Sequence, residues 1–294
     1  MASLRDIRNR IKSVKNTGQI TRAMQLVAAS KMRKAQDKAV QQRPYAIRLC
    51  ELLAAAENQA ELRNFQHPLL AERAGTKRGV LILSTDKGLC GGLNANLFKK
   101  IKDFGPDAAF ITVGRKAKQY IARTRRESLG AFHVGDTLSF SEIRPILDLF
   151  TQSYLDGHIA TMEILYPHFV NTMVQEPEVL KIAPAENLRE SVDRIKARMN
   201  VELAAAEDTR EFIFEPRVME MMDELARQVI PQEVFHVLCE ARASEHSARM
   251  VAMKAATDNA KKLVDELTLT YNKERQAAIT QEILEISAAA GATA

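Results

Sequence analysis

Tryptophan is absent from this chain of 294 residues, aromatic residues make up only 5%, and cysteine occurs three times. Ligand pockets are usually lined by aromatic and apolar side chains, so this composition disfavours an enzyme with a large pocket. The three cysteines are unevenly spaced and fit neither a disulfide framework nor a metal site, which predicts a reducing compartment. The six histidines also lack metal-ligand spacing. We therefore expect no metal ion and no cofactor.

Long apolar runs are missing as well. No stretch of about twenty apolar residues occurs, and the first residues lack the apolar segment of a secretory signal. We expect a chain that does not cross a bilayer and that works on the cytoplasmic side. The hydrophobic content of 46% is nevertheless sufficient for a packed core in the middle of the chain.

Glycine and proline are absent from Gln232 to Ala290, and the first 43 residues contain one glycine, Gly18, and no proline. Each interior glycine costs a helix about 1 kcal/mol and each proline about 3 kcal/mol, so this absence predicts two very long helices. Sixty residues of uninterrupted helix extend roughly 90 Å. Pro44 is expected to kink or end the first helix, which should then resume to about Gln59.

Small or apolar residues recur every three and four positions along the first helix, which is the pattern of a coiled coil. They are Leu4, Ile7, Ile11, Val14, Gly18, Thr21, Gln25, Ala28, Met32, Ala35 and Ala39. A similar stripe in the C-terminal helix consists of Val234, Leu238, Ala241, Ala248, Val251, Ala255, Leu263 and Leu267. We predict that the two helices pair antiparallel; the alternative is that each packs separately on a globular body.

The charge of the two ends differs in sign. Residues 1–43 carry eleven Lys or Arg against two Asp, a net charge of +9, whereas residues 232–294 carry seven basic and nine acidic residues, a net charge of −2. A helix this basic can bind nucleic acid, an anionic membrane or an acidic protein. It has no aromatic residue for base stacking before Tyr45 and few bulky residues for membrane insertion. An acidic protein partner is favoured, and a nucleic-acid-binding coiled coil is an alternative.

Short apolar runs alternate with helical patterns between the two ends. The expected strands are Gly79–Leu83, Ala108–Val113, His158–Tyr166 and Thr172–Ile182, and the expected helices are Leu93–Lys102, Lys116–Arg123 and Ser141–Leu155. This alternation predicts a Rossmann-like α/β domain with a parallel sheet covered on both faces and a hairpin that closes one edge. The chain is thus divided into an N-terminal helix (1–59), a central α/β domain (75–184), an exposed connection (185–211) and a C-terminal helix (212–294).

A glycine-rich turn, Asp86–Gly92, follows the first expected strand and precedes a helix, which is where phosphate loops occur. It lacks the spacing of both common phosphate-binding motifs, so a structural turn is favoured over a nucleotide site. Cys90 lies near a helix N-terminus, where the thiolate is favoured, but no histidine is an obvious general base for it. A small nucleotide enzyme is a further alternative.

Several blocks of sequence resemble the gamma subunit of F-type ATP synthases. They are Ile7–Thr17, Ile20–Met24, Val27–Met32, Ser84–Gly92, Ala243–Asn259, Leu269–Asn272, Arg275–Ala277, Ile279–Glu282 and Glu285–Ile286. The resemblance implies an antiparallel coiled coil of the terminal helices inside a ring of three alpha and three beta subunits. The α/β domain would form the foot, on the c ring and beside the epsilon subunit.

The same resemblance implies a function without catalysis by this chain. It would be the central rotor stalk of the complex and would transmit torque between ion-driven c-ring rotation and ATP synthesis or hydrolysis at the beta subunits, which carry the catalytic residues. It would be a peripheral protein on the cytoplasmic face of a bacterial inner membrane, attached through the c ring.

Residue roles are also implied by the resemblance. Met24 matches the position that faces an acidic lever of beta, with Arg22 and Lys31 supplying attraction. Arg275 and Gln276 match the pair that meets a catch loop of beta.

Two further segments have implied roles. Phe212 and Glu215 lie in a segment that matches the contact with the polar loops of the c ring, and Glu215 is the stronger candidate because phenylalanine lacks the hydroxyl of the family's tyrosine. The tip of the coiled coil contains Ile279, Ile283, Leu284 and Ile286. Such an apolar tip offers few directional bonds, so we expect it to turn with little friction.

Overall fold

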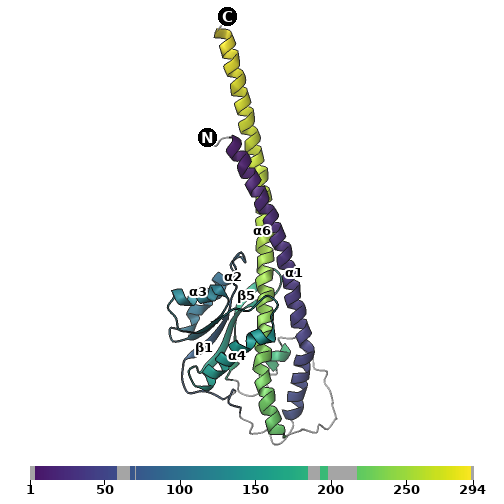
Figure 1. Ribbon diagram of the computed structural model, residues 1–294, viewed down its shortest axis with the longest axis vertical. Coiled ribbons are helices and arrows are strands. Elements are labelled where there is room, and N and C mark those ends of the chain that lie inside the picture. The colour runs from purple at the N-terminus through teal and green to yellow at the C-terminus, as the bar shows by residue number, and fades with distance from the viewer. Residues whose placement is uncertain (1–3, 58–66, 70, 185–192, 198–216, 293–294) are drawn as a thin grey trace. The chain divides into compact units, whose positions relative to one another are not determined.

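The computed structural model describes residues 4–57, 67–69, 71–184, 193–197 and 217–292 (Figure 1). The chain forms two compact units. The first unit contains Met1–Ala29 and Arg249–Ala294, and the second contains Ser30–Ala248. The predicted c-ring residues Phe212 and Glu215 lie outside the described residues.

Two long helices account for both ends of the described chain. Helix α1 spans Leu4–Glu57, and helix α6 spans Val218–Ala292. The prediction of two very long helices is confirmed, but α1 does not end at Pro44, and α6 likewise continues through Pro231. An interior proline costs a helix about 3 kcal/mol. Apolar packing on either side offsets that cost, because the following part of α1 buries its apolar face against α6.

That packing forms an apolar cluster in the second unit. From α1 it contains Ala46, Leu49, Cys50 and Leu53, and from α6 it contains Met222, Ala226 and Val229. Ile195, from the short helical segment 193–197, completes it. Of the predicted connection 185–211, the structure describes only this segment, and Ile195 is buried rather than exposed.

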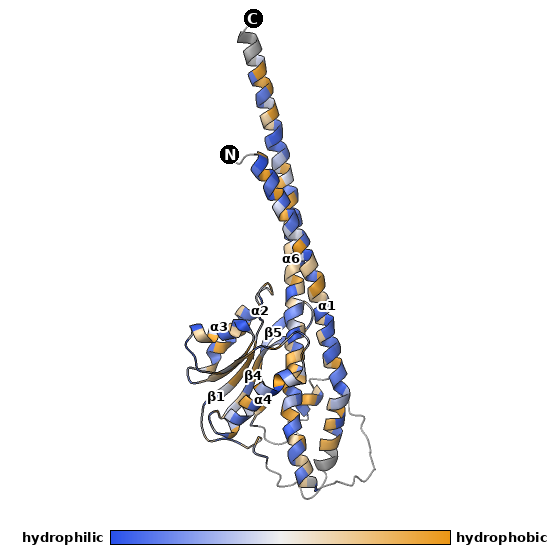
Figure 2. Ribbon diagram, viewed as in Figure 1, coloured by the Kyte–Doolittle hydropathy of each residue, from blue (hydrophilic) through white to orange (hydrophobic). Residues whose placement is uncertain are grey.

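In the first unit, α1 and α6 lie antiparallel. Gly18 faces Ala260, and Thr21 shares a hydrogen bond of 2.8 Å between hydroxyl oxygens with Thr257, so rising numbers on one helix meet falling numbers on the other. Every residue of the predicted α1 stripe is buried or half-buried, and hydrophobic and hydrophilic residues alternate along both helices (Figure 2). The antiparallel pairing is therefore confirmed. On α6, Ala255 is exposed and its neighbour Ala256 is half-buried instead.

The second unit contains a five-stranded sheet in the order β3-β2-β1-β4-β5. The strands are β1 (Arg78–Leu83), β2 (Ala109–Val113), β3 (Ser128–Phe132), β4 (Thr161–Phe169) and β5 (Gln175–Ala183). The first four are parallel, and β5 pairs antiparallel with β4 at one edge, which confirms the predicted hairpin. Strand β3 was not predicted, because none of its residues is fully buried and glycine interrupts its apolar pattern.

Helices cover both faces of this sheet. Helix α2 (Leu93–Lys100), the 3-10 helix η2 (Ile101–Phe104) and α3 (Arg115–Arg123) pack with one apolar layer of the sheet. Helix α4 (Phe140–Leu155) and part of α6 pack with the opposite layer. The predicted sheet covered on both faces is confirmed, and the single helix expected over Leu93–Lys102 changes to a 3-10 helix at Ile101.

Part of the C-terminal stripe packs against the sheet. Val234, Leu238 and Ala241 belong to the core that also contains Leu81 of β1 and Ile164 of β4. The prediction that these three residues pack against α1 was wrong. Periodicity marks the buried face of a helix but does not identify the element that covers it.

Two strands begin three residues later than predicted. Before β4, the amide of His158 donates to the carbonyl of Ser153 at the end of α4. Before β5, the amides of Met173 and Val174 donate to the side chain of Asn171, which forms a turn. Local hydrogen bonds therefore hold these residues in turns, although the sequence pattern predicted them to be part of the strands.

Candidate functional site

The predicted contact residues of the first unit lie at two separate places. Met24 is half-buried on α1 and Arg22 is exposed beside it, whereas Arg275 and Gln276 are exposed on α6. Because Thr21 pairs with Thr257, Met24 lies opposite a point on α6 that is about 20 residues, or roughly 30 Å, before Arg275. The structure thus gives two candidate contact zones rather than one site.

The far end of α6 carries an exposed apolar surface. Ile279, Ile283, Leu284 and Ile286 are between 48% and 70% exposed. The register of the helix pair places the start of α1, Leu4, opposite about residue 274, and Figure 1 shows α6 continuing beyond the start of α1. Exposed apolar side chains that gather in one region are typical of protein interaction sites.

Lys31, in the second unit, already has a partner within the chain. Its Nζ donates a hydrogen bond of 2.6 Å to Oδ2 of Asp136, and His246 Nε2 lies 3.8 Å from the other carboxylate oxygen. The hydrogen bond from Lys31 holds the pKa of Asp136 below its usual value. The charge of Lys31 is therefore compensated within the chain.

The residues that directly follow β1 anchor the start of helix α3. The amide of Arg115 donates to Oδ1 of Asp86 at 3.0 Å, and the amide of Ala117 donates to Oγ of Ser84 at 2.9 Å. The amide of Lys116 donates to the carbonyl of Thr85 at 3.1 Å. Three consecutive residues after β1 thus satisfy three amides that the helix itself leaves free.

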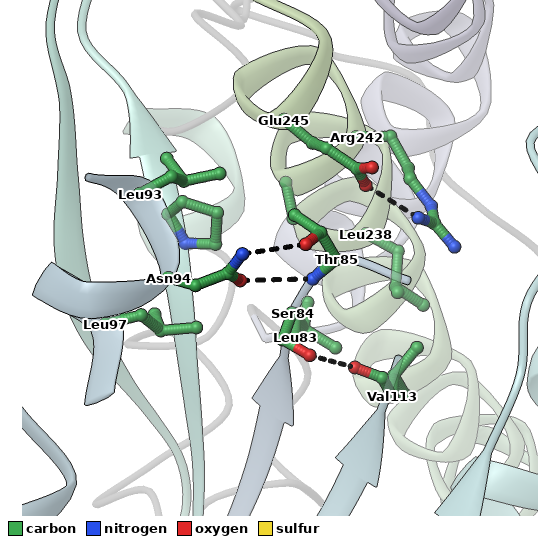
Figure 3. A pocket seen from close by; sticks show the side chains of 12 residues that line it. Leu83, Ser84, Thr85, Leu93, Asn94, Leu97, Val113, Leu238, Arg242 and Glu245 are labelled. Atoms are coloured by element: carbon green, nitrogen blue, oxygen red, sulfur yellow. Dashed lines mark hydrogen bonds and ion pairs between the residues drawn. The ribbon is translucent and has the colours of Figure 1, made fainter. Parts of the chain in front are cut away.

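A small pocket lies beside the glycine-rich turn, and hydrogen bonds join residues that line it (Figure 3). Asn94 Nδ2 donates to Oγ1 of Thr85 at 2.8 Å, and it also lies 3.3 Å from Sγ of Cys90. The cavity measures about 10 Å³ for a water-sized sphere, which corresponds to about one water molecule. Ligand pockets are far larger, so the geometry supports the structural interpretation of the turn over a nucleotide site.

Arg242 of α6 contributes a buried charge to the wall of this pocket (Figure 3). Its Nη1 donates to Oε2 of Glu245 at 2.7 Å, and its Nη2 donates to the carbonyl of Val134. Sequence reasoning missed this residue, because one arginine among small residues of a helix looks like a solvent-exposed charge.

Burial makes two of the three thiols poor nucleophiles. Loss of solvent raises the pKa of Cys50 to about 11 and that of Cys239 to about 12. Cys90 is also buried, and its Sγ lies beside the side-chain amide of Asn94. Among the described residues, no three His, Cys, Asp or Glu side chains gather as metal ligands.

None of the described helices combines the length and the apolar character that a bilayer span requires.

Comparison with known proteins identifies relatives over the whole chain. Residues 3–293 match the family model described as ATP synthase. The chain is 48% identical over 295 residues to the ATP synthase gamma chain of Opitutus terrae, with 100% of both chains covered. It is 44% identical over 295 residues to the ATP synthase gamma chain of Methylacidiphilum infernorum, with 98% of both covered.

A solved structure has the same fold. The chain resembles a chain of the Euglena gracilis mitochondrial ATP synthase, solved as an OSCP/F1/c-ring assembly, with a TM-score of 0.65. The match covers 99% of this chain and 94% of that chain at 18% identity.

Proposed function

This chain belongs to the family of ATP synthase gamma chains, and we propose that it is the central rotor stalk of an F-type ATP synthase. It couples ion-driven rotation of a c ring to ATP synthesis and hydrolysis at the beta subunits by transmitting torque. The chain itself carries out no catalysis in this proposal.

One observation carries this function: the two ends of the chain pair antiparallel, with small residues between them. At Gly18, an added Cβ would lie 3.3 Å from Cβ of Ala260, so the helices approach closely. Two helices in contact resist bending more than one, and interlocked side chains transfer twist from one to the other. A torque-transmitting shaft requires these two properties.

The partners follow from the family and from the exposed surfaces. The alpha and beta subunits would form a hexamer around the first unit, with beta contacts at Met24, Arg22, Arg275 and Gln276. The basic charge of α1 suits acidic segments of beta. Lys31 would contribute less to this attraction than Arg22, since Asp136 compensates its charge.

The apolar tip of α6 would turn inside the hexamer. Ile279, Ile283 and Leu284 offer contact area without directional hydrogen bonds, so no single angle of rotation is strongly favoured. The epsilon subunit and the c ring would bind the second unit, and Phe212 and Glu215 are proposed for the c-ring contact. The chain would be peripheral on the cytoplasmic face of the inner membrane.

The test is co-purification followed by crosslinking. The full chain is expressed with alpha and beta subunits, and a cysteine is placed at Arg22, next to Met24, with a second cysteine in the acidic lever of beta. Oxidation is expected to form a crosslink in one of the three beta subunits and to stop ATP hydrolysis reversibly. A chain that elutes without alpha and beta, or that forms no crosslink, would refute the proposal.

The two alternatives predict different results with the isolated chain. A nucleic-acid-binding coiled coil requires DNA affinity that falls steeply with salt. A nucleotide enzyme requires heat of ATP binding in calorimetry of the chain alone. We expect neither signal at physiological salt.

A further inference from the structure

The loop between β3 and α4 contacts both long helices within the second unit. We call residues 133–138 the joint loop. On the α1 side, Asp136 accepts the hydrogen bond from Lys31, and Lys38 donates to the carbonyls of Thr137 and Leu138. Lys31 and Lys38 are seven residues apart, so they lie on the same face of the helix.

On the α6 side, the joint loop receives the buried arginine. Arg242 donates to the carbonyl of Val134 and is itself held by Glu245. One turn further along α6, His246 Nε2 lies 3.8 Å from Oδ1 of Asp136. Arg242 is also 4.0 Å from Asp86, the carboxylate that caps α3. The two helices thus meet one loop, α1 through Lys31 and Lys38, which are two turns apart, and α6 through Arg242 and His246, which are one turn apart.

The joint loop is in turn held firmly by the α/β domain. Leu138 is buried in the sheet core. Ser139 and Glu142 form a capping box at the start of α4, and Glu142 Oε1 accepts the amide of Gly135 at 3.3 Å. A loop fixed by a core residue and a helix cap has little freedom to follow the helices if they turn.

The two helices depend on this loop to different degrees. Near the joint loop, α6 contributes several residues to the apolar core that packs on the sheet, among them Val234 and Leu238. Helix α1 contributes Ala39, which is half-buried against the same core. An alanine side chain buries little area and provides little resistance to rotation of a helix about its axis. Further along α1, Leu49 and Leu53 hold the helix against α6, and Lys31 and Lys38 add the directional contacts that tie residues 30–45 of α1 to the joint loop.

We propose that the joint loop prevents α1 and α6 from rotating relative to the α/β domain, and we call this role the lock. Lys38, Asp136 and Arg242 are then positioning residues for torque transmission. This inference rests on the proposed function as a rotor stalk. Without these contacts, residues 30–45 of α1 could twist relative to the α/β domain when the helix pair carries torque, and part of each rotation would be lost as elastic twist.

The test uses the double variant Lys38→Met, Asp136→Asn, which removes the hydrogen bonds of Lys38 and the negative charge that Lys31 binds, and keeps side chains of similar size. The matched control is Lys34→Met, which removes one positive charge from an exposed position one turn away on α1. In hydrogen exchange of the isolated full chain, amides of residues 30–45 and 133–138 are expected to exchange about tenfold faster in the double variant, and unchanged in the control.

The second measurement uses the assembled complex in vesicles. ATP-driven proton pumping is measured per ATP hydrolysed, first without and then against a proton gradient. The double variant is expected to hydrolyse ATP as the control does, with equal pumping at zero gradient and pumping reduced at least about threefold under load. A purely structural defect would instead lower assembly, hydrolysis and pumping together.

Three outcomes would overturn the lock: unchanged hydrogen exchange, an unchanged ratio of pumping to hydrolysis under load, or an equal loss in Lys34→Met. Failure of the unaltered chain to support any pumping would refute the proposed function instead. If the unaltered chain pumps normally and the double variant pumps equally well against a proton gradient, only the lock is refuted.

Discussion

Single residues decide how closely the two helices approach in the first unit. Gly18 is the only glycine in the first 43 residues, and it lies where an added Cβ would come within 3.3 Å of Ala260. Glycine destabilises a helix by about 1 kcal/mol relative to alanine. The close contact between the two helices at Gly18 offsets this cost. The hydroxyl pair of Thr21 and Thr257 lies one turn away.

A larger residue at this point should separate the helices. We expect Gly18→Leu to destabilise the first unit by about 1–2 kcal/mol, since overpacking exceeds the gain in helix propensity. The measurement is thermal unfolding followed by circular dichroism, with hydrogen exchange over residues 4–29. Ala23→Leu, at an exposed position of the same helix, should leave both unchanged. Equal stability of the two variants would contradict the close approach.

The thiols provide a second prediction at this scale. Because burial raises the pKa of Cys239 to about 12 and that of Cys50 to about 11, the folded chain contains almost no thiolate from either residue at pH 8. We expect iodoacetamide to modify neither residue in the native chain and both in urea, as measured by peptide mass spectrometry. Rapid native labelling of Cys239 would show that α6 does not pack on the sheet as described.

Elements depend on contacts that lie outside their own sequence. Helix α3 starts at Arg115 because residues of the turn after β1 bind its first amides, and Gly114 makes this possible. At Gly114, φ is +95°, and an added Cβ would lie 2.3 Å from the carbonyl oxygen of Ser84. No other residue fits at this position without moving one of the two connections.

We therefore expect Gly114→Ala to lower the free energy of unfolding by about 3 kcal/mol, through strain in φ and a steric clash with backbone. This loss is measured by unfolding the full chain in urea while tyrosine fluorescence is recorded. Gly88→Ala is the matched control, since an added Cβ there meets no atom within 4 Å, and its effect should stay within about 0.5 kcal/mol. Similar losses in both variants would mean that the turn tolerates no side chain at all, contrary to the geometry.

The whole molecule is a member of a family that works inside a larger complex, so its function is tested through coupling. Changing Met24→Lys adds a cation beside Arg22, where the proposal places an acidic lever of beta. A stronger attraction would favour one angle of rotation and resist the next step. We expect proton-driven ATP synthesis to fall several-fold, with subunit stoichiometry unchanged.

The measurement compares synthesis, hydrolysis and subunit content in vesicles. Met24→Leu, which conserves size and apolar character, serves as the control and should retain normal synthesis. Unchanged synthesis in Met24→Lys would count against the proposed contact, while loss of assembly would point to a structural role for Met24 in the seam.

Much of this protein could be predicted from residue patterns. The absence of glycine and proline predicted the terminal helices. The recurrence of small or apolar residues every three and four positions predicted the stripe on α1, all of which is buried or half-buried. Apolar runs between turn residues predicted four of the five strands and their hairpin. These features are local, because helix propensity and the periodicity of burial are properties of neighbouring residues.

Long-range partners could not be read from the same patterns. The stripe at Val234, Leu238 and Ala241 showed that this part of α6 is buried, but only the fold assigns it to the sheet. Strand β3 forms because β2 provides its hydrogen bonds, although its own apolar signal is weak. Arg242 and Asp136 acquire their roles from groups about a hundred residues away along the chain.

The sequence by itself thus determined the type of each long element, the buried face of α1 and, through its motifs, the family. The tertiary structure decided which element covers each buried face and which charges meet. The physical reason is that burial depends on a residue's own chemistry, whereas a contact depends on two residues that the fold must bring together.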